Sequence, residues 1–249
     1  MSGFDPDRFS RLDSPLHNWE ARTRLISLFI LIISIVIAGD IIHALAGLAI
    51  SILLVLISGL PLSQAVAFMK WPFIFLLPML LILPITTSVE PYLDFGLLKI
   101  SQEGLNLGLL FMIRGLAAAF SALIIMGTAP FNVNINSLSS LGMPSSLAQI
   151  FLFTYRYVFL LYDELQTMKR SLDSKGFEMR SNVRSAGILA TAIAMLLIRS
   201  YERSEDVFNA MLSRGYEGRL PSIQRQNICL IDLFKGALIC AAAVVIHFI

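Results

Sequence analysis

The chain has 249 residues, of which 56% are apolar and 14% charged, and its mean hydropathy is +0.75. A sequence this apolar cannot keep its surface hydrated as a soluble domain, so that class is excluded and lipid must be part of its solvent. The formal net charge is only +2. We expect the lipid bilayer, and no nucleic acid, among its binding partners.

Five apolar runs follow one another as candidate membrane spans. A spanning helix needs about 20 mostly apolar residues, and the runs cover residues 25–39, 41–60, 71–87, 105–129 and 228–249. Asp40 alone separates the first two, which implies a tight turn at one membrane face. The sequence therefore predicts an all-α membrane protein with about five transmembrane helices.

Two further apolar runs, residues 147–162 and 186–198, are shorter and decide the topology. If both crossed the bilayer, basic segments would face both sides of the membrane. Cytoplasmic loops normally carry the excess of Lys and Arg, and this rule is satisfied if neither run crosses. We therefore expect both runs to form long, partly amphipathic helices in or near the cytoplasmic interface.

This topology divides the chain into four parts. Residues 1–24 form a cytoplasmic N-terminal segment, 25–129 hold the first four spans, 130–225 form a cytoplasmic domain of long helices, and 226–249 hold the last span. Ten of the nineteen Lys and Arg residues lie between positions 165 and 225. The chain is expected to be a multi-pass protein of the cell's inner (cytoplasmic) membrane, with its C-terminus outside.

The cytoplasmic domain contains a short internal repeat. Residues 174–180 (SKGFEMR) and 213–219 (SRGYEGR) agree in six of seven positions, by identity or by chemical equivalence. Each copy follows a helical stretch, and its glycine suits the left-handed conformation that ends a helix. We expect two helix ends that each present a cation, an aromatic ring and a Glu.

A basic residue in the last turn before a glycine is also ordinary helix-ending chemistry, which stabilises a helix by about 0.3–1 kcal/mol through its dipole. One copy alone would favour this explanation. Two copies with the same flanking residues, in a chain without an enzyme motif, favour docking to a partner that has two equivalent grooves. Upstream of the second copy, residues 199–212 have helical spacing, with an apolar face and four charged residues available for pairing: Arg199, Glu202, Arg203 and Asp206.

Taken together, these motifs resemble the transmembrane T component of energy-coupling factor transporters, and most closely its CbiQ family. The resemblance covers nearly the whole chain, and the order and spacing of the pieces carry it. They are SPLH at 14–17, GLPL at 59–62, EGL at 103–105, LGMP at 141–144, TYRY at 154–157, RSYERSE at 199–205 and AMLSRGY at 210–216.

The resemblance implies a non-catalytic coupling subunit that transmits ATPase movement to a substrate-binding membrane subunit. Its implied partners are two CbiO-like ATP-binding-cassette subunits, a CbiM-like substrate-binding subunit and a small CbiN-like accessory subunit. The long cytoplasmic helices would be coupling helices. By resemblance, the ATPase-coupling residues are Ser174, Lys175, Gly176, Ser213, Arg214 and Gly215. The supporting residues on the helix before the second motif are Arg199, Glu202, Arg203 and Glu205.

The first motif departs from the family pattern, because Ser174 and Lys175 stand where the family usually has Ala and Arg. Lysine supplies the charge but not the bidentate fork of arginine. The first contact is therefore expected to be the weaker of the two.

Motifs for independent chemistry are missing from the sequence. It contains no GxxxxGK[ST] phosphate cradle, no HExxH metal motif and no GxSxG nucleophile motif. His17, His43 and His247 are scattered, and no cluster has metal-ligand spacing. We expect no enzymatic activity, no cofactor and no metal site in this chain.

Two other function classes stay open. A self-sufficient secondary transporter or channel would normally show inverted repeats and charged midplane sites, and an intramembrane enzyme acting on lipid would need an acid-base or nucleophile set. Arg114 lies within the fourth apolar run and is either a polar strut or a residue of a transport pathway. The resemblance implies cobalt or nickel as the cargo of the complex, without separating the two.

Overall fold

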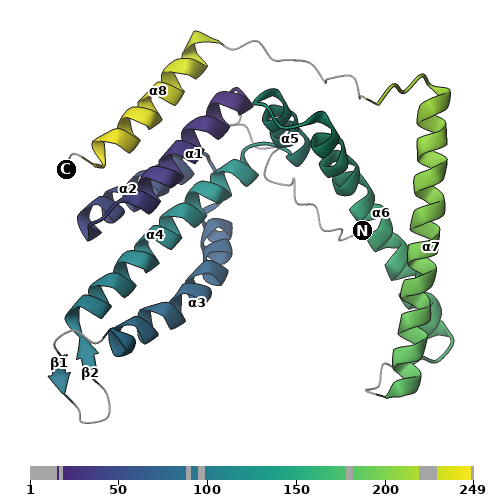
Figure 1. The fold of residues 1–249 in the computed structure, drawn as a ribbon, viewed down its shortest axis with the longest axis horizontal. Helices are drawn as coiled ribbons and strands as arrows, with labels where there is room; N and C mark the ends of the chain where they lie inside the picture. Colours follow the sequence, from purple (N-terminus) through teal and green to yellow (C-terminus); the bar gives the residue numbers. More distant parts are fainter. Residues whose placement is uncertain are drawn as a thin grey trace. The chain divides into compact units, whose positions relative to one another are not determined.

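The computed structural model describes residues 16, 19–87, 91–94, 99–177, 182–218 and 229–247. Helices dominate this part of the chain (Figure 1). It divides into two compact units, Met1–Ser137 with Arg225–Ile249, and Leu138–Gln224. The helices are α1 (Ala21–Ile37), α2 (Ile41–Ile57), α3 (Leu62–Thr86), α4 (Gln102–Gly127), α5 (Phe131–Ser140), α6 (Ser145–Ser174), α7 (Val183–Ser213) and α8 (Leu230–Val245).

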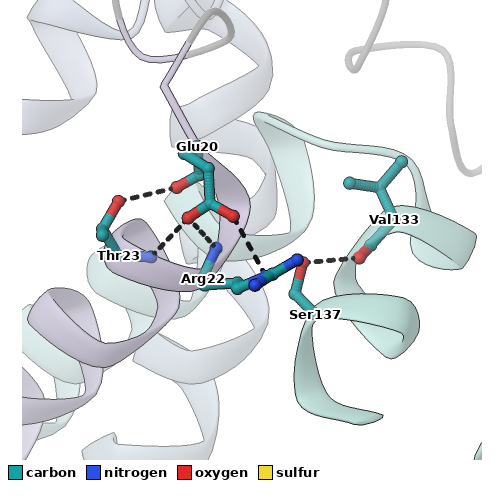
Figure 2. Close-up of polar contacts among 5 residues, drawn as sticks. All are labelled: Glu20, Arg22, Thr23, Val133 and Ser137. Carbon is teal, nitrogen blue, oxygen red and sulfur yellow. Dashed lines mark hydrogen bonds and ion pairs between the residues drawn. The ribbon is translucent and has the colours of Figure 1, made fainter. Parts of the chain in front are cut away.

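Helix α1 begins at a side-chain cap that is not apparent from the apolar pattern. The carboxylate of Glu20 accepts hydrogen bonds from the backbone N–H groups of Arg22 at 3.0 Å and Thr23 at 3.1 Å (Figure 2). It also pairs with Arg22 Nε at 3.1 Å. A carboxylate at a helix N-terminus satisfies free backbone donors and complements the helix dipole. The cap therefore fixes where the first apolar helix starts.

Helix α4 is the centre of the first unit, because it packs against α1, α2 and α3, while α1 also packs against α8. The side chains of this core are apolar and fully or almost fully buried: Leu28, Leu31, Ile35, Val55, Ala117, Ile124, Ile239 and Ala243. A buried hydrogen bond of 3.1 Å between the hydroxyls of Ser51 and Ser121 joins α2 to α4. Small polar links of this kind are typical of helix packing in membranes.

Helices α3 and α4 approach each other closely along a row of glycines. A Cβ added at Gly104 would lie 2.6 Å from the backbone oxygen of Leu83, and one at Gly108 would lie 3.2 Å from Leu80 Cα. Helix α3 carries three internal prolines, at positions 72, 78 and 84. Membrane helices tolerate such prolines because neighbouring helices and local adjustments satisfy the freed backbone groups.

The outer faces of these helices expose large apolar side chains, including Phe29, Trp71 and Phe75, which is 81% exposed. Lipid contact explains this exposure, whereas water contact would not. Three helices in the described part of the chain are long and apolar enough to cross a membrane: Leu62–Thr86, Gln102–Gly127 and Ser185–Ser213. The helical membrane fold expected from the sequence is confirmed.

Several boundaries differ from the sequence-based expectation. Helix α3 starts before Lys70 rather than after it, and α5 was not predicted. A short antiparallel strand pair, β1 (Pro91–Asp94) and β2 (Lys99–Ser101), precedes α4, in the segment between the third and fourth predicted spans. The runs at 147–162 and 186–198 are the apolar parts of helices of 30 and 31 residues, in agreement with the long helices expected there.

Candidate functional site

The first of the two repeated motifs ends helix α6, and we call residues 174–177 the first tip. Gly176 has φ of +74°. Its N–H donates to Asp173 O at 3.0 Å, and Phe177 N–H donates to Leu172 O at 3.1 Å. This pair of hydrogen bonds around a left-handed residue is the Schellman arrangement, which satisfies the free carbonyls of a helix end. The glycine conformation expected from the sequence is confirmed.

The second motif ends helix α7 in the same way, and residues 213–216 are the second tip. Gly215 has φ of +81°, its N–H donates to Leu212 O at 3.0 Å, and Tyr216 N–H donates to Met211 O at 3.1 Å. The two tips thus repeat one backbone geometry as well as one sequence. In both, the serine hydroxyl donates to a carbonyl of the preceding turn, Ser174 to Ser171 and Ser213 to Asn209, at 2.9 Å each.

The cations of both tips are exposed. Lys175 and Arg214 each precede the glycine of their tip, and their backbone N–H groups donate to Leu172 O and Met211 O. Glu217 is exposed beside the second tip, whereas Glu178 and Arg180 of the first motif lie outside the described residues. A cation at the end of a helix complements its dipole and can form charge-assisted hydrogen bonds to an acidic partner.

The second tip has a contact that sequence reasoning missed. Tyr216 Oη donates to Gln149 Oε1 at 2.6 Å, and Gln149 Nε2 donates to Gly218 O at 3.3 Å. Gln149 lies in the second turn of α6, 67 residues from Tyr216, so no local pattern predicts it. The signal available was the difference between the two copies, since Tyr216 has a hydroxyl where Phe177 has none.

The four predicted supporting residues have different surroundings on α7. Arg199 forms an ion pair and hydrogen bond with Glu164 of α6, a partner that the sequence analysis did not name. Arg203 lines a cleft between the two helices, and Glu202 and Glu205 are exposed. The structure therefore brings Arg199 and Arg203 to the α6–α7 contact and leaves the two glutamates at the surface.

The cleft between α6 and α7 has a volume of about 520 Å³ and mostly apolar walls. Residues from both helices line it, among them Phe153, Tyr157, Val207, Phe208 and Met211. Tyr216 of the second tip lines it as well. The apolar face predicted for residues 199–212 thus forms one wall of this cleft.

A second polar cluster lies in the first unit, around the fully buried Arg24. Its guanidinium donates to Thr128 O at 3.1 Å, to Asn134 Oδ1 at 3.0 Å and to Leu16 O at 3.4 Å. Asn134 Nδ2 in turn donates to Ile125 O at 3.0 Å. Arg24 entered the sequence analysis only as part of the N-terminal segment, and the structure makes it the link between the start of α1, the end of α4 and α5.

Arg114 is half-buried in the middle of α4, and its Nε is buried without a hydrogen-bond partner among the described residues. The described part of the chain contains no group of three or more His, Cys, Asp or Glu side chains that could hold a metal ion.

Comparison with known proteins places these features in a family. The sequence profile of the CbiQ family, described as cobalt transport protein, matches residues 13–224. This match includes both tips and most of the chain. The chain belongs to the CbiQ family.

Similar proteins support the same placement. An uncharacterized protein of Methanocaldococcus jannaschii is 28% identical over 237 residues, covering 91% of this chain and 80% of the relative. An energy-coupling factor transporter transmembrane protein of Macrococcus caseolyticus is 26% identical over 223 residues, covering 85% and 84%. One from Thermanaerovibrio acidaminovorans is 25% identical over 218 residues, covering 83% and 80%. The family resemblance inferred from the sequence is confirmed, and the chain is a membrane component of a transport system.

Proposed function

We propose that this CbiQ-family chain is the coupling subunit of an ATP-driven importer, and that its two tips dock into two ATPase subunits. The observation that carries the proposal is the pair of tips with the same backbone geometry, each with an exposed cation. A dimeric ATPase offers two equivalent grooves, so a matched pair of helix ends is complementary to it. The named relatives, which are energy-coupling factor transmembrane proteins, support this role.

The docking chemistry follows from the exposed cations. Lys175 and Arg214 end their helices without a side-chain ion pair in the described part of the chain. An acidic groove would supply carboxylates, and Arg214 can bind a carboxylate through two parallel hydrogen bonds whereas Lys175 cannot. Removing one member of a desolvated charge pair weakens binding by about 2–5 kcal/mol. The second tip should therefore be the stronger anchor.

The rest of the complex is proposed on the same basis. The chain has no phosphate-binding motif of its own, so ATP hydrolysis would belong to CbiO-like partners. A CbiM-like subunit, with a CbiN-like accessory, would bind the cargo, and the complex would lie in the cell's inner membrane. Cobalt is favoured as cargo by the description of the matching family, with nickel as the second candidate.

The experiment is a pull-down of the ATPase, combined with a metal-uptake assay, for tip variants of the complete complex. Arg214→Ala should lower ATPase retention about tenfold or more, since each 1.4 kcal/mol corresponds to a factor of ten. Arg214→Glu should be at least as severe, and Lys175→Ala should do less. The double variant should nearly abolish assembly.

Arg170→Ala is the matched control, because Arg170 is an exposed cation on α6 just before the first tip. It should leave retention and uptake unchanged. Full retention and full uptake in Arg214→Glu would refute the docking role and leave the motifs as ordinary helix ends.

A further inference from the structure

Besides the residue before the glycine, the two tips differ in their contacts, because hydrogen bonds connect the second tip to the beginning of α6. Gln149 forms two hydrogen bonds there, accepting from Tyr216 Oη and donating to Gly218 O. The two bonded residues, Tyr216 at the end of the tip and Gly218 just after it, lie on either side of Glu217. We call the three residues Gln149, Tyr216 and Gly218 the strap.

Gln149 can hold the second tip because its own position is fixed. It lies on α6 beside Ala148, which is 5% exposed, and both Gln149 and Tyr216 are half-buried. The ring of Tyr216 lines the apolar cleft between α6 and α7, so its hydroxyl is the polar end of an otherwise apolar contact. A tyrosine with a packed ring and a bonded hydroxyl has little freedom to move.

Helix α6 itself connects the strap to the first tip. About 25 residues separate Gln149 from Ser174, which is roughly 38 Å of continuous helix. The ion pair between Arg199 and Glu164 joins α6 and α7 a second time, within their length. A displacement of the second tip is therefore passed to the helix that carries the first tip.

We propose that Gln149 is a positioning residue that holds the Arg214 tip against α6 and thereby makes the two tips move together. This inference rests on the proposed docking function for its consequence in transport. Its structural part, the immobilisation of the second tip, does not depend on that function. Because Phe177 has no hydroxyl, the first tip cannot form the same tyrosine contact.

The structural part is tested by amide hydrogen exchange on the full-length protein in detergent. Gln149→Leu removes both hydrogen bonds at nearly constant size and should speed exchange in residues 211–218 about fivefold, as expected for losing about 1 kcal/mol of local stability. Exchange in residues 171–177 should not change. Tyr216→Phe removes only the hydroxyl contact and should give a smaller increase.

The matched control is Gln166→Leu, since Gln166 lies on the same helix, is half-buried, and forms no side-chain hydrogen bond with described residues. It should leave exchange in residues 211–218 unchanged. Equal acceleration at both tips, or none at the second tip in Gln149→Leu, would overturn the inference.

The functional part is tested by a double-mutant cycle in the transport complex. Gln149→Leu should reduce uptake while most of the ATPase is retained, because the Arg214 cation is still present. In a protein that already carries Arg214→Ala, Gln149→Leu should cause no further loss of uptake, since the strap acts through that tip. Combined with Lys175→Ala, its effect on uptake should be less than additive, because the strap couples the second tip to a first tip that is no longer docked.

These outcomes separate the two proposals. If Arg214→Ala itself leaves ATPase retention unchanged, the docking function fails, whatever Gln149→Leu does. If Arg214→Ala acts as expected but Gln149→Leu leaves uptake unchanged, or adds a further loss to the Arg214→Ala protein, docking stands and the role of Gln149 fails.

Discussion

Arg24 shows how one buried cation can hold several elements in a membrane protein. Its guanidinium bonds to Thr128 O and Asn134 Oδ1, and it is fully buried. A buried charge is tolerated when hydrogen bonds replace its hydration, and removing it leaves its acceptors without donors. The residue therefore links the start of α1 to α5 through chemistry that an apolar side chain cannot supply.

We predict that Arg24→Met lowers the free energy of unfolding by on the order of 3 kcal/mol, because at least two buried acceptors would lose their donor at about 1–3 kcal/mol each. Thermal unfolding of the purified protein in detergent measures the effect. Arg22→Met is the control: Arg22 is partly exposed and pairs with Glu20, and such pairs contribute about 0–1 kcal/mol. Equal destabilisation by both variants would contradict the assigned role of Arg24.

In the proposed complex, the residue before each tip glycine would set how strongly that tip binds the ATPase. We predict that Lys175→Arg leaves ATPase retention unchanged or raises it, because arginine can add a second parallel hydrogen bond to a carboxylate. Co-purification of the ATPase at increasing salt concentration measures this, since salt screens exposed charge pairs. A loss of retention in Lys175→Arg would show that the first groove is shaped for lysine.

At the scale of elements, the closest helix contact in the first unit lies between α3 and α4. The backbone of α3 occupies the space where a Cβ at Gly104 would lie, 2.6 Å from Leu83 O. At Gly115, the nearest atom is instead the flexible Leu76 Cδ1, at 2.5 Å. Because backbone cannot rotate away as a side chain can, the two glycines differ in what they tolerate.

We predict that Gly104→Ala lowers the free energy of unfolding by about 1–3 kcal/mol, as overpacking usually does. Gly115→Ala should lower it by less. Gly187→Ala in α7 is the control, because a Cβ there meets nothing within 4 Å. This control should be neutral or stabilising by up to about 1 kcal/mol, from the higher helix propensity of alanine. Unfolding temperatures in one detergent compare the three variants, and a harmless Gly104→Ala would mean that α3 can move away from α4.

At the scale of the whole molecule, the position of the tips depends on whether α7 crosses the membrane. Ser185–Ser213 is long and apolar enough to do so, although the distribution of basic residues disfavours a crossing. The two alternatives place the tips differently. If α7 crossed, the two tips would face opposite sides of the membrane and could not reach one ATPase dimer.

We predict that cysteines placed at positions 175 and 214 react from the cytoplasmic face only, in a background where Cys229 and Cys240 are replaced by serine. Labelling with an impermeant reagent in intact cells and in inverted vesicles measures this. An epitope attached to the C-terminus should be reached only from outside, as the predicted topology requires. Labelling of positions 175 and 214 from opposite faces would overturn both that topology and two-tip docking.

The sequence by itself determined the class of the protein and the nature of the tips. Apolar runs of spanning length predict a helical membrane protein because backbone groups in lipid must be satisfied within helices. The repeat around Gly176 and Gly215 predicts two helix ends because only glycine readily adopts the positive φ that both have. These are local properties, so a local pattern is sufficient to predict them.

Only the tertiary structure decided what those local elements contact. Gln149 and Tyr216 are 67 residues apart, and Arg24 and Asn134 are 110 residues apart. Long helices were expected at α6 and α7, but where each begins and ends was not, because their polar halves lack the apolar signal of a span. Long-range partners are chosen by how helices pack, and a single sequence carries no periodic signal of that choice. The sequence therefore predicted the tip residues, whereas the strap beside the Arg214 tip became visible only in the fold.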